Sequence, residues 1–194
     1  MNKLLLLIST IVLLTGGTSL AEVYTVDPNH AEIGFSVKHM VITNVKGAFR
    51  EYTSHFEIDT NNKLTALSAE VDVKSIDTRI KKRDDHLRSA DFFEVEKFPS
   101  ITFKSLSVKP ESNNRYTVTG ELKIRDISKP VELTGELVGP VKDPWGNQRM
   151  GIVLNGQIDR KVFGLTYNKV LESGGLLIGD EVKIHLEGEG ILNK

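Results

Sequence analysis

The feature that most constrains the fold of this chain is a hydrophobic alternation with a period of two residues. In several segments apolar residues occupy every second position and polar or charged residues lie between them. Side chains two residues apart in a β-strand point to the same face, so each segment predicts a strand with one apolar and one polar face. The clearest segments are 31–37, 67–73, 116–124, 131–137, 150–158 and 182–190.

Turn-forming residues separate these segments, as in Asp143-Pro144-Trp145-Gly146-Asn147. Strands of this kind, about eight in all, predict an all-β domain that is either an antiparallel sandwich or a closed barrel. We favour a single antiparallel β-barrel, because closure removes the exposed edges of long strands. No linker or change of composition divides residues 22–194, which we therefore interpret as one domain.

The first residues predict export. Lys3 precedes an apolar run at 4–14, and the small residues Ser19 and Ala21 occupy the −3 and −1 positions of a cleavage site. We expect a signal peptide over residues 1–21 and an exported mature protein. A retained anchor is the alternative, although the apolar run is short for a bilayer span. The chain has no cysteine, which excludes disulfides and a cysteine-linked lipid anchor.

Charge excludes one class of partner. The 25 basic and 26 acidic residues nearly balance, and no basic run or stripe is present, so nucleic-acid binding is not expected.

One region interrupts the strand pattern. Residues 75–98 are densely charged, and we expect a short helical insertion near residues 78–90, capped by Thr78, with Leu87 and Ile80 turned inward. The segment RDDHLRSADFF in this region raises three possibilities: a catalytic site, a metal site, or a charged clamp that positions the aromatic pair Phe92 and Phe93.

Familiar catalytic motifs are absent. There is no G-x-S-x-G motif, no cysteine nucleophile and no glycine-rich nucleotide loop. No two of the five histidines have a metal-ligand spacing on one element. We therefore predict no catalytic residue, no metal ligand and no required cofactor. A metal-dependent enzyme that uses His39, Asp84, His86 and Asp91 is retained as an alternative.

The inward faces of the strands leave two interpretations open. Gly120, Gly135, Gly156 and Gly188 fall at inward positions, where glycine marks a bend or a space. A barrel of this size is either filled by side chains or holds one small ligand. The remaining inward residues are almost all apolar, so a cavity would take a hydrophobic ligand.

The chain resembles the YceI-like family of periplasmic polyisoprenoid-binding proteins. The resemblance is carried, in order, by the segments YTVDPNHAEIGFSVKHM, VKGAFREY, VKSIDTR, RDDHLRSADFFEVEKFPSITFKS, GELKIRDISKPVEL, DPWGNQRMG and DRKVFGL, which together cover almost the whole of residues 22–194. Two departures are Ala31, where serine is expected, and Arg125-Asp126-Ile127, where a glycine-threonine turn is usual.

The resemblance implies a lipocalin-like barrel with a long apolar tunnel for an isoprenoid chain, such as a quinone tail or a polyprenyl lipid. It implies a non-enzymatic carrier that requires no cofactor and holds an isoprenoid lipid or quinone. It leaves open a transient contact with a membrane or membrane enzyme, and a homodimer. A stress-related scaffold with a filled barrel is a further alternative. The residues expected to contact the lipid are Phe35, Val37, Phe49, Val71, Phe92, Phe93, Phe103, Val118, Leu122, Leu133, Ile152, Leu154 and Phe163.

The charged cluster is then interpreted as a structural clamp. Its ion pairs and hydrogen bonds are expected to fix the helical insertion, so that at least one of the Phe92 and Phe93 rings turns into the interior. The predicted clamp residues are Arg83, Asp84, His86, Arg88 and Asp91. Residues 168–179 are expected to form an ordinary strand after a turn, and a hairpin or lid at one end of the barrel is the alternative.

Overall fold

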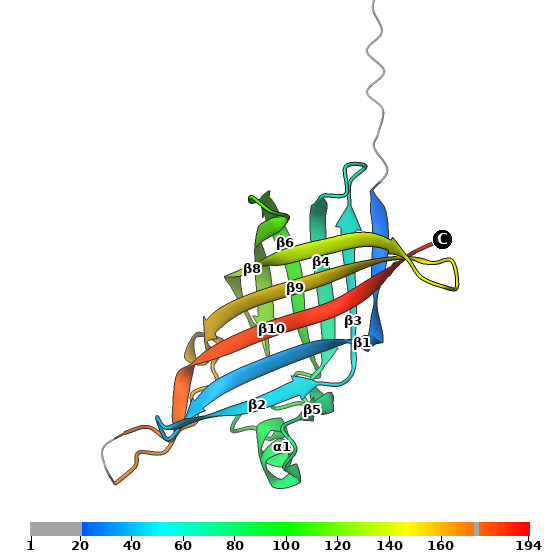
Figure 1. The fold of residues 1–194 in the computed structure, drawn as a ribbon. Helices are drawn as coiled ribbons and strands as arrows, with labels where there is room; N and C mark the ends of the chain where they lie inside the picture. The colour runs from blue at the N-terminus through cyan, green and yellow to red at the C-terminus, as the bar shows by residue number, and fades with distance from the viewer. Residues whose placement is uncertain (1–20, 173–174) are drawn as a thin grey trace, which may run out of the picture.

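A computed structural model of the protein describes residues 21–172 and 175–194, so the predicted signal peptide lies outside the described residues apart from Ala21. Strands make up most of the described chain (Figure 1). The strands are β1 (Glu22–His39), β2 (Thr43–Phe49), β3 (Tyr52–Ile58), β4 (Leu64–Asp72), β5 (Ile76–Asp77), β6 (Ser100–Pro110), β7 (Arg115–Ile124), β8 (Ile127–Lys142), β9 (Gln148–Asp159) and β10 (Ile178–Leu192). The helices are the 3-10 helices η1 (Val73–Ser75) and η2 (Arg160–Phe163) and the α-helix α1 (Lys81–Arg88).

The sheet closes on itself through β1. One edge of β1 pairs with β10. The other edge pairs with β3 near the start of β1 and with β2 near its end. Because β2 and β3 both run antiparallel to β1, they act as two parts of one bent strand, and β4 and β5 do the same beside them. The result is a closed, eight-stranded antiparallel barrel, which confirms the predicted fold class.

The two bends lie side by side. The Arg50 amide donates to the Ser75 carbonyl at 3.3 Å, and the Asp72 amide donates to the Glu51 carbonyl at 2.9 Å. Beyond the bends β5 pairs with β2 but not with β6. One edge of β6 pairs with β7, and the other edge pairs with β4 alone. The segment from residue 78 to residue 99, which includes α1, connects β5 to β6 at this end of the barrel (Figure 1).

The helical insertion is shorter than predicted. Helix α1 begins at Lys81, its N-cap residue is Ile80, and no side chain caps it, so the prediction that Thr78 caps the helix is wrong. The Thr78 hydroxyl donates to Asp84 instead. Leu87 packs against the core as expected, whereas Ile80 is exposed.

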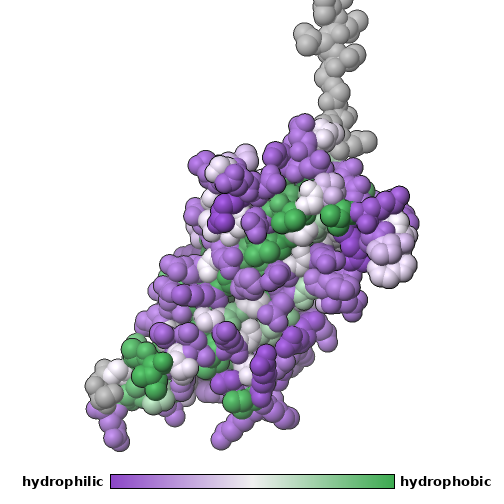
Figure 2. Space-filling view, viewed as in Figure 1, coloured by the Kyte–Doolittle hydropathy of each residue, from purple (hydrophilic) through white to green (hydrophobic). Residues whose placement is uncertain are grey.

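The barrel is solidly packed at one end only. This closed end carries the turns at 59–63, 111–114 and 143–147. Here the rings of Tyr24 and Phe56 stack with centroids 5.2 Å apart. Around them lie further buried side chains from five strands, namely Ile58, Leu64, Tyr116, Val118, Leu137 and Met150. Polar residues cover most of the outer surface in the view of Figure 2, as the alternation predicts.

The inward glycines are explained by close packing. A Cβ atom at Gly135 would lie 1.7 Å from the Val153 carbonyl oxygen, and one at Gly120 would lie 2.3 Å from the Phe103 ring. Gly156 and Gly188 are crowded in the same way by neighbouring side chains. The space that these four glycines leave is therefore occupied by protein atoms.

Candidate functional site

The half of the barrel opposite the closed end is hollow. It encloses a cavity of about 400 Å³, within the usual range of ligand pockets. The lining comes from the barrel strands, from residues 83–93 around α1 and from residues 165–178. Almost all of it is apolar, so the cavity suits a hydrophobic ligand held by the burial of apolar surface.

The boundary between the hollow and filled halves crosses individual strands. On β7 Leu122 lines the cavity and Val118 does not; on β8 Leu133 lines it and Leu137 does not. The same division separates Leu154 from Met150 on β9. Because the closed end is filled, the long apolar tunnel that the resemblance implied is a blind pocket that occupies one half of the barrel. We call its other end, beside α1 and residues 165–178, the mouth.

Eleven of the predicted contact residues line the cavity: Phe35, Val37, Phe49, Val71, Phe92, Phe93, Phe103, Leu122, Leu133, Ile152 and Leu154. Val118 and Phe163 do not line it and are buried in the packed core instead. Several further lining residues lie on strands where the alternation could have indicated them, including Ile33, Leu67, Ala69, Ile184 and Leu186.

Aromatic rings form part of the wall near the mouth. The His86 ring meets the rings of Phe92 and Tyr167 edge to face, with centroids 5.1 and 4.9 Å apart. Phe93 makes an edge contact with Phe49 at 6.2 Å. Both phenylalanines of the predicted pair therefore face the cavity. Tyr167 also lines it, although no local pattern in the sequence indicated Tyr167 as a lining residue.

The clamp residues bind both backbone and side-chain groups around them. Among the five, only His86 and Asp91 pair with each other, with Nε2 and Oδ2 2.8 Å apart. Arg88 donates to the carbonyls of Lys74 and Ile76, both at 2.8 Å. It also forms an ion pair with Asp85, a residue that was not among the predicted clamp residues.

The other two clamp residues converge on one threonine. Arg83 donates to the Thr78 hydroxyl and carbonyl oxygens at 2.7 and 2.8 Å. Asp84 accepts from the Thr78 amide and hydroxyl. The cluster thus ties α1 to the residues that precede it, and Arg83 and His86 also reach the cavity wall.

A buried arginine shapes the other side of the mouth. The Arg160 guanidinium donates to the carbonyls of Gly179 at 2.9 Å, Tyr167 at 3.0 Å and Leu165. Burial lowers the pKa of this guanidinium, which is partly offset by the attraction of Asp180. Arg160 therefore holds together the two ends of the segment between η2 and β10.

That segment folds back on itself. Val170 and Leu176 pair as an antiparallel bridge, and the Asn168 side chain bonds both the amide and the carbonyl of Ile178. The favoured interpretation of residues 168–179 as an ordinary strand is wrong, because β10 begins only at Ile178. The alternative, a hairpin at one end of the barrel, fits the residues on either side of 173–174, which lie outside the described residues.

One polar group inside the cavity lacks a partner. The hydroxyl of Tyr52 is buried, and no hydrogen-bond partner for it exists among the described residues. Burial raises the pKa of this phenol, with a smaller contribution from Glu32. Tyr52 is thus a neutral hydrogen-bond donor in a wall that is mostly apolar.

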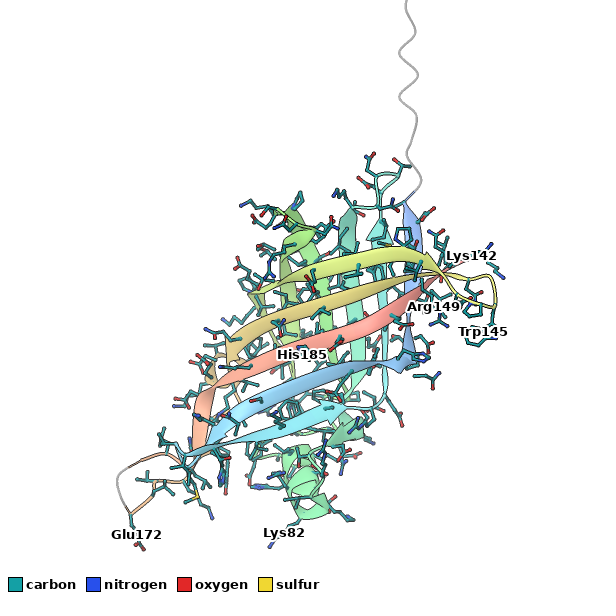
Figure 3. The ribbon with its side chains drawn as sticks, in the orientation of Figure 1. Lys82, Lys142, Trp145, Arg149, Glu172 and His185 are labelled. Carbon is teal, nitrogen blue, oxygen red and sulfur yellow. The ribbon has the colours of Figure 1, made fainter. Side chains whose placement is uncertain are left out.

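The histidines do not gather into a metal centre. His39 and His86 both line the cavity, but His185 lies on β10 and bonds Asn155 across the strands (Figure 3). Over residues 21–172 and 175–194, no group of three or more histidine, aspartate or glutamate side chains is arranged to hold a metal ion. Over the same residues, no helix is both long and apolar enough to cross a membrane.

The closed end carries a compact ion-pair network. Arg149 lies beside the β8–β9 turn (Figure 3) and contacts Asp143 at 2.9 Å, Asp27 at 3.1 Å and Glu189 at 3.1 Å. The bond from Arg149 holds the pKa of Asp143 well below its ordinary value. Bonds from His30, the Asn29 amide and Arg149 do the same for the pKa of Asp27.

Solved structures share this fold. BcnA of Burkholderia cenocepacia superposes with a TM-score of 0.71 at 23% identity, over 84% of this chain and 98% of its own. A polyisoprenoid-binding domain from Saccharophagus degradans gives a TM-score of 0.64 at 13% identity, over 88% and 98%. The YCEI protein of Campylobacter jejuni gives 0.70 at 30% identity, over 81% and 90%.

Sequence comparison gives the same family. Protein YceI of Salmonella newport is 34% identical over 186 residues, which is 94% of each chain. A UPF0312 protein of Photorhabdus laumondii is 38% identical over 155 residues, or 78% of this chain and 80% of its own. The model of the YceI-like domain matches residues 24–190. The resemblance noted in the sequence is thereby confirmed, and the chain belongs to the YceI-like family.

Proposed function

We propose that this protein is a non-enzymatic periplasmic carrier that holds the chain of an isoprenoid lipid, such as a quinone tail or a polyprenyl group, in the blind pocket. The observation that carries the proposal is the division of one barrel into a filled half and a hollow, apolar half. A scaffold that only needed stability would fill both halves, because an empty apolar cavity destabilises a fold.

Three further observations support the proposal. Packed side chains close the pocket at the end away from the mouth, so a lipid tail would enter it end first and leave its head group near the mouth. The related fold from Saccharophagus degradans is a polyisoprenoid-binding domain. Export to the periplasm, where lipids must cross water between two membranes, is supported by the predicted signal peptide at residues 1–21.

The proposal is tested by filling the pocket. Ala69 lines the cavity from β4, and Ala69→Trp places an indole in it without removing a polar contact. Glu70, the next residue on β4, is exposed and supplies the matched control Glu70→Trp. Native mass spectrometry of protein purified without detergent, followed by titration with a quinone and a polyprenol, measures what each variant holds.

We expect the wild type and Glu70→Trp to retain an isoprenoid and Ala69→Trp to lose it while unfolding cooperatively. Equal lipid retention in both variants would place the lipid outside the pocket. A wild type that neither co-purifies with an isoprenoid nor binds an added one would refute the proposed function.

A further inference from the structure

Two turns at the mouth expose large apolar side chains to solvent. Val41 and Ile42, between β1 and β2, are 67% and 80% exposed, and Val170 is 76% exposed. Met40 and Leu176 beside them are exposed as well. In Figure 2 an apolar patch lies at the lower left, where Figure 1 places these two turns. We call the five residues 40–42, 170 and 176 the apolar tip.

The two turns form one surface. The Met40 amide donates to the Leu177 carbonyl at 2.8 Å, and His39 pairs with Ile178 in the β1–β10 ladder. The Val41 side chain also lies next to Gly175, since a Cβ atom there would be 3.8 Å from its Cγ2. The side chains of the apolar tip are therefore displayed together.

The backbone of the first turn is strained. Met40 and Val41 have φ angles of +51° and +66°, in the left-handed region that a β-branched residue such as valine strongly disfavours. Glycine or asparagine would close the β1–β2 connection with less strain and a more polar surface. Strain of this kind is found mainly at functional sites. Two independent features that lower the stability of the fold, backbone strain and exposed apolar surface, thus occur together at the apolar tip.

The apolar tip continues into the pocket. Four residues adjoining it, His39, Lys169, Leu177 and Ile178, line the cavity. An apolar chain leaving the pocket at this point would meet the apolar tip before it met water.

Lysines surround the tip. Lys38 and Lys169 flank the two turns, and Lys82 projects from α1 at the same end (Figure 3). Within the described residues none of these three lysines forms an ion pair, and Glu172 is the acidic residue on the hairpin (Figure 3). This combination of an apolar tip and basic flanks complements a surface of anionic head groups over hydrocarbon.

We propose that the apolar tip docks the protein on an anionic phospholipid bilayer, with Val41, Ile42 and Val170 inserted among the acyl chains and the pocket mouth facing the membrane. This inference rests on the proposed function, because it assigns the route by which the lipid enters and leaves. The pocket would then exchange its lipid directly with the bilayer.

The test is cosedimentation with phosphatidylglycerol–phosphatidylethanolamine vesicles and with phosphatidylcholine vesicles, at low and high salt. We expect the wild type to bind the anionic vesicles, more weakly as salt rises, since salt screens the lysines. The double variant Ile42→Ser/Val170→Ser should lower the partition coefficient at least about tenfold. Val138→Ser, which removes a 58% exposed valine near the closed end, is the matched control and should bind as the wild type does.

Native mass spectrometry of the same variants separates the two proposals. If the wild type holds an isoprenoid but does not bind anionic vesicles, docking is refuted and the carrier function stands. If it binds vesicles but never holds an isoprenoid, the carrier function fails. If the double variant abolishes a dimer seen by sedimentation velocity and still binds vesicles, the tip is an interface between two copies and docking is refuted.

Discussion

A single carboxylate oxygen of Asp84 accepts two hydrogen bonds from Thr78, one from the backbone amide at 2.9 Å and one from the hydroxyl at 2.5 Å. Both residues are buried. Arg83 donates to the same threonine hydroxyl oxygen at 2.7 Å, so the Thr78 hydroxyl bridges the guanidinium and the carboxylate through two hydrogen bonds. This arrangement fixes the first turn of α1 against the chain that enters it, which no N-cap side chain does.

We predict that Asp84→Ala lowers the free energy of unfolding by about 2–4 kcal/mol, because the buried Thr78 amide loses its acceptor and Arg83 loses a nearby opposite charge. Urea denaturation measures this change. Asp85→Ala is the control, since Asp85 is an exposed partner of Lys81 and Arg88 and its loss should change the stability much less than the loss of Asp84 does. Equal losses in the two variants would show that the Asp84 bonds do not stabilise the segment.

Arg160 is the subject of a second prediction. Arg160→Lys should lower the free energy of unfolding by about 3 kcal/mol, because one ammonium group cannot reach the separate carbonyls of Leu165, Tyr167 and Gly179. Hydrogen exchange should also quicken between residues 165 and 178. The exposed neighbour Lys161 pairs with Asp180, and Lys161→Ala should cost about 1 kcal/mol or less. A lysine variant as stable as the wild type would contradict the anchoring role.

The strands could be predicted because they depend on local alternation, and the closure of the barrel could be inferred because closure removes the exposed edges of long strands. The segment 116–124 became β7 (Arg115–Ile124), and 150–158 became β9 (Gln148–Asp159). The division into hollow and filled halves could not be predicted in this way. Val118 and Leu122 share the inward face of one strand, and only the three-dimensional arrangement gives them different depths along the barrel axis.

Arg160 and Thr78 show two further contacts that could not be predicted from the sequence. The partners of Arg160 are carbonyl oxygens, which every residue carries, so no residue pattern indicates them. Thr78 is a good N-cap residue by type, yet the buried carboxylate of Asp84 offers its hydroxyl a charged acceptor, and the tertiary contact prevails over the local preference.

A third prediction concerns acid stability. A carboxyl group whose pKa is lowered by folding stabilises the protein above its ordinary pKa of 3.8, and this contribution is lost as the pH falls toward the folded pKa. Asp143 and Asp27 are such groups, held by Arg149 and, for Asp27, chiefly by His30. The wild type should therefore lose stability steadily below about pH 4.

Arg149→Gln should be less stable than the wild type at pH 6 but should lose less stability between pH 5 and pH 2, since the pKa of Asp143 returns toward its ordinary value. Urea midpoints across this range give the comparison. Arg115→Gln removes an exposed arginine that has no ion pair among the described residues, and its curve should run parallel to that of the wild type. A parallel curve for Arg149→Gln as well would rule out the network as the source of the acid sensitivity.

The last prediction concerns the unpartnered hydroxyl in the pocket. A buried hydroxyl without a partner destabilises a fold by about 1–3 kcal/mol, so Tyr52→Phe should raise the free energy of unfolding of the lipid-free protein by about 1 kcal/mol. Tyr24→Phe should instead lower the free energy of unfolding in the same urea assay, because the Tyr24 hydroxyl bonds Gln148 at 2.5 Å and Glu22 at 3.3 Å. If Tyr52→Phe destabilises the lipid-free protein, the hydroxyl has a partner in the empty pocket. If it stabilises the protein as expected, the Tyr52 hydroxyl is retained although it lowers the stability of the empty protein, which supports a hydrogen bond from Tyr52 to the ligand that we propose for the pocket.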